Sequence, residues 1–321
     1  MIRFALIVLL SALGVSHTCA QSRWPDRSVR FIVPFPAGSA TDIVARLVAQ
    51  RLGAKLNQQF VVDNRAGASG ALGTEAVARA APDGYTIGLA TTSTHVLAVS
   101  LNPNLSYDPV TNFAPIGMIG SAPYVLAVSN SVPAKSIAEL VALAKAKPKS
   151  LNYASAGPAS MAHLAGALFE TLTGADLTHV PYRSSAQAVL DVVEGRIEMQ
   201  FGTIAPTLPH ITEGKMRALG VTSAQRLSPL PDVPTIAEGG VPGYEASLWM
   251  AIVAPAATPA EITGRLNGLV NEALGSEDLK KALRDQGVEA EPGTREALVA
   301  RIPQDVAKWR RVVTQANIKP E

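Results

Sequence analysis

The chain has 321 residues, and its 28 Lys and Arg nearly balance 26 Asp and Glu, so the formal net charge is only +2. The basic residues are dispersed rather than gathered into an arm or stripe, which excludes the electrostatic footprint of a nucleic-acid-binding protein. Behind a short N-terminal segment, about 300 residues remain, enough for two domains of ordinary size.

The N-terminal segment predicts export. Arg3 precedes an apolar run over 4–15 that is too short to span a bilayer, and small residues around Ala20 offer a cleavage site. We expect residues 1–20 to be a signal peptide and the mature protein to be soluble and periplasmic. A lipid anchor on Cys19 is the less favoured alternative. Because Cys19 is the only cysteine, the mature chain is expected to form no disulfide.

Strands and helices alternate along the rest of the chain. Short β-branched or apolar runs predict strands, and apolar residues at helical spacing predict helices. The first series has strands over 29–33, 60–62 and 85–90 and helices over 40–56 and 74–81. The second has strands over 125–128, 151–154, 178–180 and 197–201 and helices over 136–147, 160–172 and 186–194. A last buried strand over 248–254 is followed by amphipathic helices over 259–274 and 295–315, with no further strand.

This order predicts an α/β protein of two parallel sheets. The last helices have no sheet of their own to cover, so we expect them to return to the first one. The chain would then cross between domains near 121–124 and 246–250, and two crossings make a hinge. We expect domain I over 21–122 plus 250–321 and domain II over 123–249, with a central ligand cleft because open α/β sheets bind ligands at the carboxyl ends of their strands.

Loops after four predicted strands share one chemistry: small or hydroxyl side chains and backbone N–H groups at a helix start. They span residues 34–42, 91–95, 155–160 and 182–185. In the first, Ser39 and Asp42 have the spacing of a helix cap, while Ala37 and Gly38 leave room for an anion beside the helix N-terminus. The loops therefore predict a site that binds an anion through N–H groups and hydroxyls, without a positively charged side chain. Tight turns and ordinary caps remain the alternative reading.

The sequence lacks the motifs of nucleotide-binding sites, metal sites and hydrolases. The glycine-rich stretch 67–73 has neither dinucleotide-binding spacing nor a Walker lysine, and it reads as a tight turn. The histidines are not at metal-ligand spacing, and no nucleophile elbow occurs. We therefore expect no catalytic residue, no metal and no cofactor. His163 is either a packed residue or a ligand contact, and Arg183 either binds a carboxylate or extends to solvent.

Several motifs in order along the mature chain resemble one family. They are PFPAGSATD (34–42), VDNRAGASG (62–70), AAPDGYT (80–86), YDP (107–109), VPYR (180–183) and GKMRAL (214–219). They resemble the Bug family, the extracytoplasmic receptors of tripartite tricarboxylate transporters. The resemblance implies a type II periplasmic binding protein fold with two α/β domains, a two-crossing hinge and a central cleft. Family loops often have Gly-Gly where this chain has Gly38-Ser39, and Pro158 is another departure, so the identity of the ligand is not carried over.

The resemblance implies a periplasmic receptor, not an enzyme, that captures a small carboxylate: a di- or tricarboxylate, an acidic amino acid or an aromatic acid. Its partners would be the membrane permease subunits, with a sensor kinase as a further candidate, and we expect a monomer. The alternative function is an exported α/β hydrolase or isomerase with a diffuse active site. The residues expected to bind the ligand are Phe35, Ala37, Gly38, Ser39, Thr41, Thr91, Thr92, Ser155, Ala156, Ser160, His163, Arg183, Ser184, Gly202 and Thr203.

Overall fold

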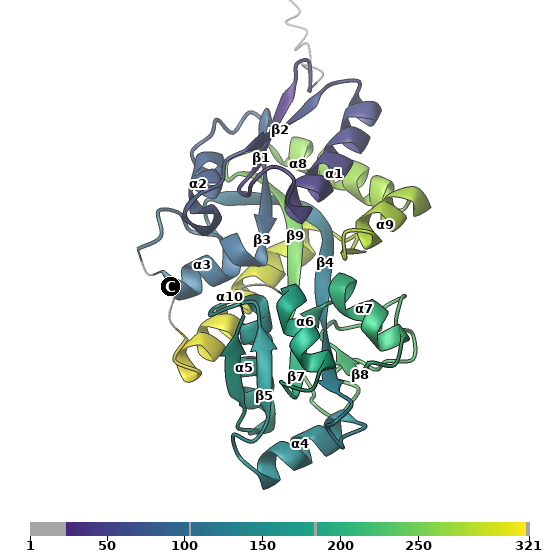
Figure 1. Cartoon of the computed structure of the whole chain (residues 1–321). Helices are drawn as coiled ribbons and strands as arrows, with labels where there is room; N and C mark the ends of the chain where they lie inside the picture. Colours follow the sequence, from purple (N-terminus) through teal and green to yellow (C-terminus); the bar gives the residue numbers. More distant parts are fainter. Residues whose placement is uncertain (1–23, 103, 183–184, 319–321) are drawn as a thin grey trace, which may run out of the picture.

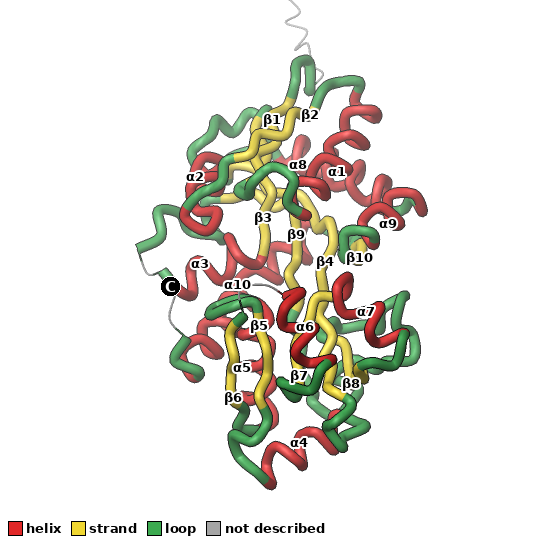
Figure 2. Tube along the Cα trace, in the orientation of Figure 1, coloured by secondary structure: helices red, strands yellow, loops and turns green. Residues whose placement is uncertain are grey.

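Alternating strands and helices build two lobes that are joined by two long strands (Figures 1 and 2). The computed structural model describes residues 24–102, 104–182 and 185–318. Within these ranges no helix is both long and apolar enough to cross a bilayer. The α/β fold predicted from the sequence is confirmed. The predicted pair of purely parallel sheets is wrong, because one ten-stranded sheet runs through both lobes and contains antiparallel pairs.

The upper lobe of Figure 1 contains the first predicted series. Its strands are β1 (Val29–Val33), β2 (Phe60–Asn64) and β3 (Thr86–Thr91), and β1 pairs in parallel with both neighbours. Its helices are α1 (Ala40–Leu56), η1 (Ala68–Gly70), α2 (Ala71–Ala78), the π-turn η2 (Ser93–Leu97), α3 (Ala98–Leu101), α8 (Ala260–Leu274) and α9 (Glu277–Arg284). The glycine-rich stretch forms a tight turn as predicted, since Gly67, Ser69 and Gly70 all have positive φ.

The lower lobe contains the second series. Its strands are β5 (Asn152–Ser155), β6 (Thr178–Pro181), β7 (Met199–Thr203) and β8 (Met216–Val221), and β5 pairs in parallel with β6 and β7. Its helices are α4 (Ile137–Ala146), α5 (Met161–Thr173), α6 (Ser185–Val193) and α7 (Ile204–Thr212). Sequence patterns did not predict α7, β8 or α9, because Pro206 and Pro209 interrupt the pattern of α7 and the others are short.

Strand β4 (Phe113–Ser129) runs through both lobes. It pairs with β9 (Ser247–Pro255) over its first part and with β7 and β8 over its second. The sequence predicted only 125–128 of its 17 residues, since Pro115, Gly117 and Gly120 resemble strand breakers. Register shifts at these residues absorb the irregularity. The expectation of no strand after 254 is wrong, because β10 (Glu289–Ala290) pairs with β4.

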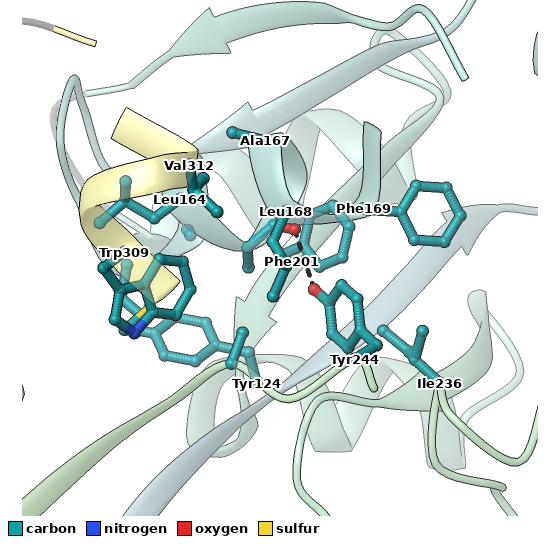
Figure 3. Close-up of a cluster of buried hydrophobic side chains, with 14 of the residues drawn as sticks. Tyr124, Leu164, Ala167, Leu168, Phe169, Phe201, Ile236, Tyr244, Trp309 and Val312 are labelled. Carbon is teal, nitrogen blue, oxygen red and sulfur yellow. Dashed lines mark hydrogen bonds between the residues drawn. The ribbon is translucent and has the colours of Figure 1, made fainter. Parts of the chain in front are cut away.

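Helix α10 (Arg295–Gln315) packs against both lobes rather than returning only to the first. It contacts η2 and α3 of the upper lobe, α5 of the lower lobe, and β4. Figure 3 shows Trp309 and Val312 of α10 beside Leu164 of α5 and Tyr124 of β4. One hydrophobic cluster therefore continues across the junction of the lobes, while a second fills the upper lobe around β1, α1 and α8.

Candidate ligand-binding site

The directions of the strands bring the predicted loops together at the junction of the two lobes. β9 is antiparallel to both β3 and β4, so β1, β3 and β4 all run toward the lower lobe. β7 is antiparallel to β4, so β5, β6 and β7 run toward the upper lobe. The carboxyl ends of both sets therefore point at the junction of the lobes. The β1–α1, β3–η2, β5–α5, β6–α6 and β7–α7 connections all emerge there (Figure 1).

The β1–α1 loop ends in a capped helix start. Ser39 is the N-cap of α1, and its Oγ accepts from the Asp42 N–H at 3.3 Å and donates to the Pro36 carbonyl at 2.7 Å. The predicted cap is thus confirmed. The N–H groups of Ala40 and Thr41 donate to no other described residue. They remain available at the positive end of the helix dipole, beside exposed Ala37 and Gly38.

The buried carboxylate of Asp42 holds this loop in place through hydrogen bonds. This group, 2% exposed, accepts hydrogen bonds from the Gly38 N–H at 2.8 Å, Asn64 Nδ2 at 2.9 Å and Arg46 Nε at 3.1 Å. Burial by itself would raise the pKa of Asp42, but the Arg46, Gly38 and Asn64 hydrogen bonds outweigh it and hold the pKa below its ordinary value. Asn64 also donates to the Phe35 carbonyl at 3.1 Å. The loop is therefore fixed before any ligand arrives.

The threonines at the end of β3 face inward. Thr91 and Thr92 are buried. Thr91 exchanges hydrogen bonds with Thr94, and Thr92 Oγ1 accepts from the Trp249 N–H at 2.8 Å. The Thr92 hydroxyl thus ties the loop to β9, while the Thr91 hydroxyl bonds within the loop.

The β5–α5 loop is also capped. Ser160, the N-cap of α5, accepts from the His163 N–H at 3.3 Å and donates to the Gly157 carbonyl at 2.7 Å. Ser155 is 2% exposed, and its Oγ lies 2.6 Å from His179 Nε2 and 3.1 Å from both the N and O of Gly157. Ala156 is exposed. Ser155 therefore shapes the loop from inside, and Ala156 and Ser160 lie at its surface.

Two histidines stack beneath this loop. The rings of His163 and His179 are parallel within 7°, with centroids 3.7 Å apart. His163 Nδ1 accepts from the Ala159 N–H at 3.1 Å. Sequence analysis singled out His163 but not His179, because His179 lies on a separate strand and no spacing pattern connects the two.

The β7–α7 connection adds a helix N-terminus that has no side-chain cap. Thr203 is the N-cap of α7, but its side chain makes no capping hydrogen bond, and Gly202 before it is buried. Arg183 and Ser184, predicted at the β6–α6 loop, lie outside the described residues. A cavity of about 380 Å³ lies beside Thr203 between the lobes, lined by Pro123, Ile204 and Leu208 from below and by Arg284, Gly287 and Glu289 from above.

Comparisons with known proteins agree with this architecture. The family described as "Tripartite tricarboxylate transporter family receptor" matches residues 44–318. Protein BugT of Bordetella pertussis is 35% identical over 97% of this chain and 96% of its own. The structure of R. palustris Rpa4515 with adipate is 38% identical, with a TM-score of 0.72 over 93% of this chain and 100% of that one. A ligand-free TctC solute-binding protein from Polaromonas is 28% identical, with a TM-score of 0.84 over 91% and 99%.

These matches confirm the Bug resemblance and the two-domain binding-protein fold. They extend over nearly the whole chain rather than over one lobe. The chain belongs to the tripartite tricarboxylate transporter receptor family, as a solute-binding receptor of the Bug type.

Proposed function

We propose that this protein captures a small carboxylate between its lobes in the periplasm and delivers it to a tripartite tricarboxylate-type permease. The observation that carries the proposal is the convergence of βα loops from both lobes, through opposite strand directions, on one junction. The adipate bound to Rpa4515 supports a dicarboxylate, within the wider class of di- and tricarboxylates, acidic amino acids and aromatic acids.

The grip would use backbone N–H groups and hydroxyls rather than cations. On the upper lobe we assign the N–H groups of Ala40 and Thr41, with Phe35, Ala37, Gly38, Ser39 and Thr41 forming the surface around them. On the lower lobe we assign Ala156, Ser160 and Thr203. The N-terminus of α1 from the upper lobe and those of α5 and α7 from the lower lobe would stabilise both charges of a dicarboxylate from opposite sides.

The molecule would close on its ligand. The chain is nearer in shape to the ligand-free Polaromonas protein than to adipate-bound Rpa4515, although the second is nearer in sequence. This supports an open conformation here. We propose that domain I comprises residues 21–122 and 250–321 and that domain II comprises residues 123–249. The hinges would lie where β4 and β9 pass between the lobes. We further propose a monomer without enzymatic activity, whose signal peptide is cleaved near Ala20.

A thermal melt with adipate tests the function. A ligand at about 100 times its dissociation constant should add roughly 2.7 kcal/mol to the stability of the folded protein. Adipamide, the uncharged diamide, is the matched control and should give no shift. A shift with both compounds would contradict charge recognition, and turnover of adipate in the same tube would favour the exported hydrolase or isomerase instead. If adipate gives no shift, malate and glutamate extend the test to other acids of the proposed class.

Gly38 offers the sharpest test of the ligand contacts proposed for the upper lobe. Its φ is +80°, and an added Cβ would meet no atom within 4 Å. Valine there would be strained by the backbone conformation, so Gly38→Asn is the better probe, since asparagine tolerates this conformation. We expect Gly38→Asn to fold and to weaken adipate binding at least about tenfold, because the new side chain would occupy space beside the Ala40 and Thr41 N–H groups and displace the ligand carboxylate. A tenfold loss is about the effect of losing one hydrogen bond to a charged group.

Ser39→Ala is the matched control for Gly38→Asn. It removes the cap of α1, so it should cost about 1 kcal/mol of stability with a smaller effect on affinity. Normal adipate binding by folded Gly38→Asn would show that this loop is not the anion grip.

A further inference from the structure

The β5–α5 loop contains a turn that its own residues do not favour. Gly157 has a φ of +109° and Ala159 a φ of +55°, on either side of Pro158. Glycine adopts positive φ readily, but alanine in this region is uncommon because its Cβ crowds the backbone. Ala159 therefore needs contacts from outside the turn to stay in this conformation.

The stacked histidines supply those contacts at both ends of the turn. His163 Nδ1 accepts from the Ala159 N–H at 3.1 Å. His179 Nε2 lies 2.6 Å from Ser155 Oγ, which in turn accepts from the Gly157 N–H at 3.1 Å. Because the two rings stack at 3.7 Å, moving either imidazole would disturb the partner of the other.

The arrangement requires neutral rings. An Nδ1 atom that accepts from an N–H must carry a lone pair, so protonation of His163 there would set two donors against each other. Protonation of both rings would place two cations in contact. The neutral pair is thus the form that fits the turn.

The surroundings keep the pair neutral near pH 7. Burial lowers the pKa of His163, and burial followed by the nearby His163 lowers the pKa of His179 to about 4. The pair borders a cavity of about 530 Å³. Its other titratable lining groups among the described residues are Tyr153 of β5 and Glu170 of α5, both with pKa values raised chiefly by burial. The end of α10 contributes only uncharged Gln315, followed by Ala316.

We propose that His163 and His179 are positioning residues that hold the Gly157–Ala159 turn in its binding shape, and that protonation of the pair loosens the turn and weakens ligand binding. The effect on binding rests on the function proposed above, whereas the effect on the turn does not. Neither histidine needs to touch the ligand for this role.

Hydrogen–deuterium exchange of residues 156–160 tests the turn directly. His163→Phe keeps a stacked ring but removes the acceptor, so we expect exchange at pH 7.5, corrected for intrinsic rates, to rise about tenfold. His163→Gln, whose amide oxygen can accept but not titrate, should restore protection and remain protected at pH 4, where the wild type should lose it. His210→Gln on α7 removes a histidine elsewhere and should behave as the wild type does. Circular dichroism confirms that each variant is folded, and His179→Phe replaces His163→Phe if the latter is not.

Binding of adipate is measured on the same proteins. We expect at least about threefold weaker binding by His163→Phe at pH 7.5 and a loss of wild-type affinity toward pH 4 that His163→Gln lacks. Wild-type exchange in the folded His163→Phe variant, or pH-independent protection in the wild type, would overturn the positioning role whether or not adipate binds. A loosened turn with unchanged adipate affinity would overturn the link to binding. Failure of the wild type to bind any small carboxylate would instead count against the proposed function, and the exchange result would still decide the role of the pair in the turn.

Discussion

His95 shows at the scale of one residue how burial determines chemistry. Its side chain is 0% exposed, and its ring lies 4.7 Å from that of Phe113 between centroids. Nδ1 is 3.0 Å from Thr94 Oγ1, but Nε2 has no hydrogen-bond partner among the described residues. Burial lowers the pKa of His95 to about 3. The ring is therefore neutral in the folded protein and protonates near its ordinary pKa only after unfolding.

This difference makes stability depend on pH. Below about pH 6.5 the unfolded chain binds a proton at His95 that the folded protein cannot bind until near pH 3, so the free energy of unfolding falls as the pH is lowered. Between pH 6.5 and 5 the loss from His95 should be about 1.5 kcal/mol. His95→Phe should remove this part of the slope. Urea unfolding at several pH values measures it, and equal slopes for the two proteins would contradict the burial argument.

At the scale of elements, the packing of α5 on β5 depends on a missing side chain. A Cβ on Gly166 of α5 would lie 2.3 Å from Cε2 of Tyr153, whose ring is 5.1 Å from that of His179. Tyr244, from the segment before β9, also holds α5 by donating to the Ala165 carbonyl at 2.9 Å, a bond drawn in Figure 3. α5 thus positions the histidine pair through packing as well as through hydrogen bonds.

Gly166→Ala should therefore destabilise the protein by about 1 to 3 kcal/mol, because the new methyl group displaces the Tyr153 ring. Gly268 of α8 is the matched control, since a Cβ there would meet no atom within 4 Å. Gly268→Ala should stabilise the protein by up to about 1 kcal/mol, the helix preference of alanine over glycine. Denaturant unfolding compares the two variants, and stabilisation by both would contradict the close contact.

For the whole molecule, a charged cluster on α10 connects the segments that pass between the lobes. Arg301 lies 3.0 Å from Glu245 and 3.1 Å from Glu291, and Asp305 accepts from Trp249 Nε1 of β9 at 2.9 Å. Glu291 also accepts from Ser121 Oγ of β4. Helix α10 thus holds both joining strands.

Arg301→Met should leave carboxylates at this junction without their partner. Methionine keeps much of the packing volume, so the expected loss of about 1 to 3 kcal/mol reflects mainly the unpaired charges, reduced by partial exposure. Lys281→Met breaks an exposed pair with Asp285 and should change stability by less than about 0.5 kcal/mol. Chemical unfolding measures both variants, and equal effects would show that the α10 cluster adds no more than a surface pair.

The proposed closure is a second prediction for the whole molecule. Because the ligand would contact loops of both lobes, it should favour the closed arrangement through its additional contacts. Small-angle scattering should therefore report a smaller radius of gyration with saturating adipate than without it. An unchanged radius despite bound adipate would argue against motion about β4 and β9.

The sequence by itself determined the features that depend on neighbouring residues. Alternating apolar runs placed most strands and helices, and Ser39 and Ser160 were recognisable as helix starts because a cap acts within three residues. The family motifs and the positions of the βα loops were readable for the same reason.

Only the tertiary structure decided what distant segments do together. β4 extends through Pro115 and Gly117 because pairing with β9 tolerates register shifts that no local propensity predicts. The hydroxyls of Thr92 and Ser155 look available in the sequence, but Trp249 and His179 occupy them in the fold. His179 joins His163 because β6 lies beside β5. Hydrogen bonds and ring stacking between residues far apart in the chain exist only once the sheet has formed, so they leave no periodic pattern in the sequence.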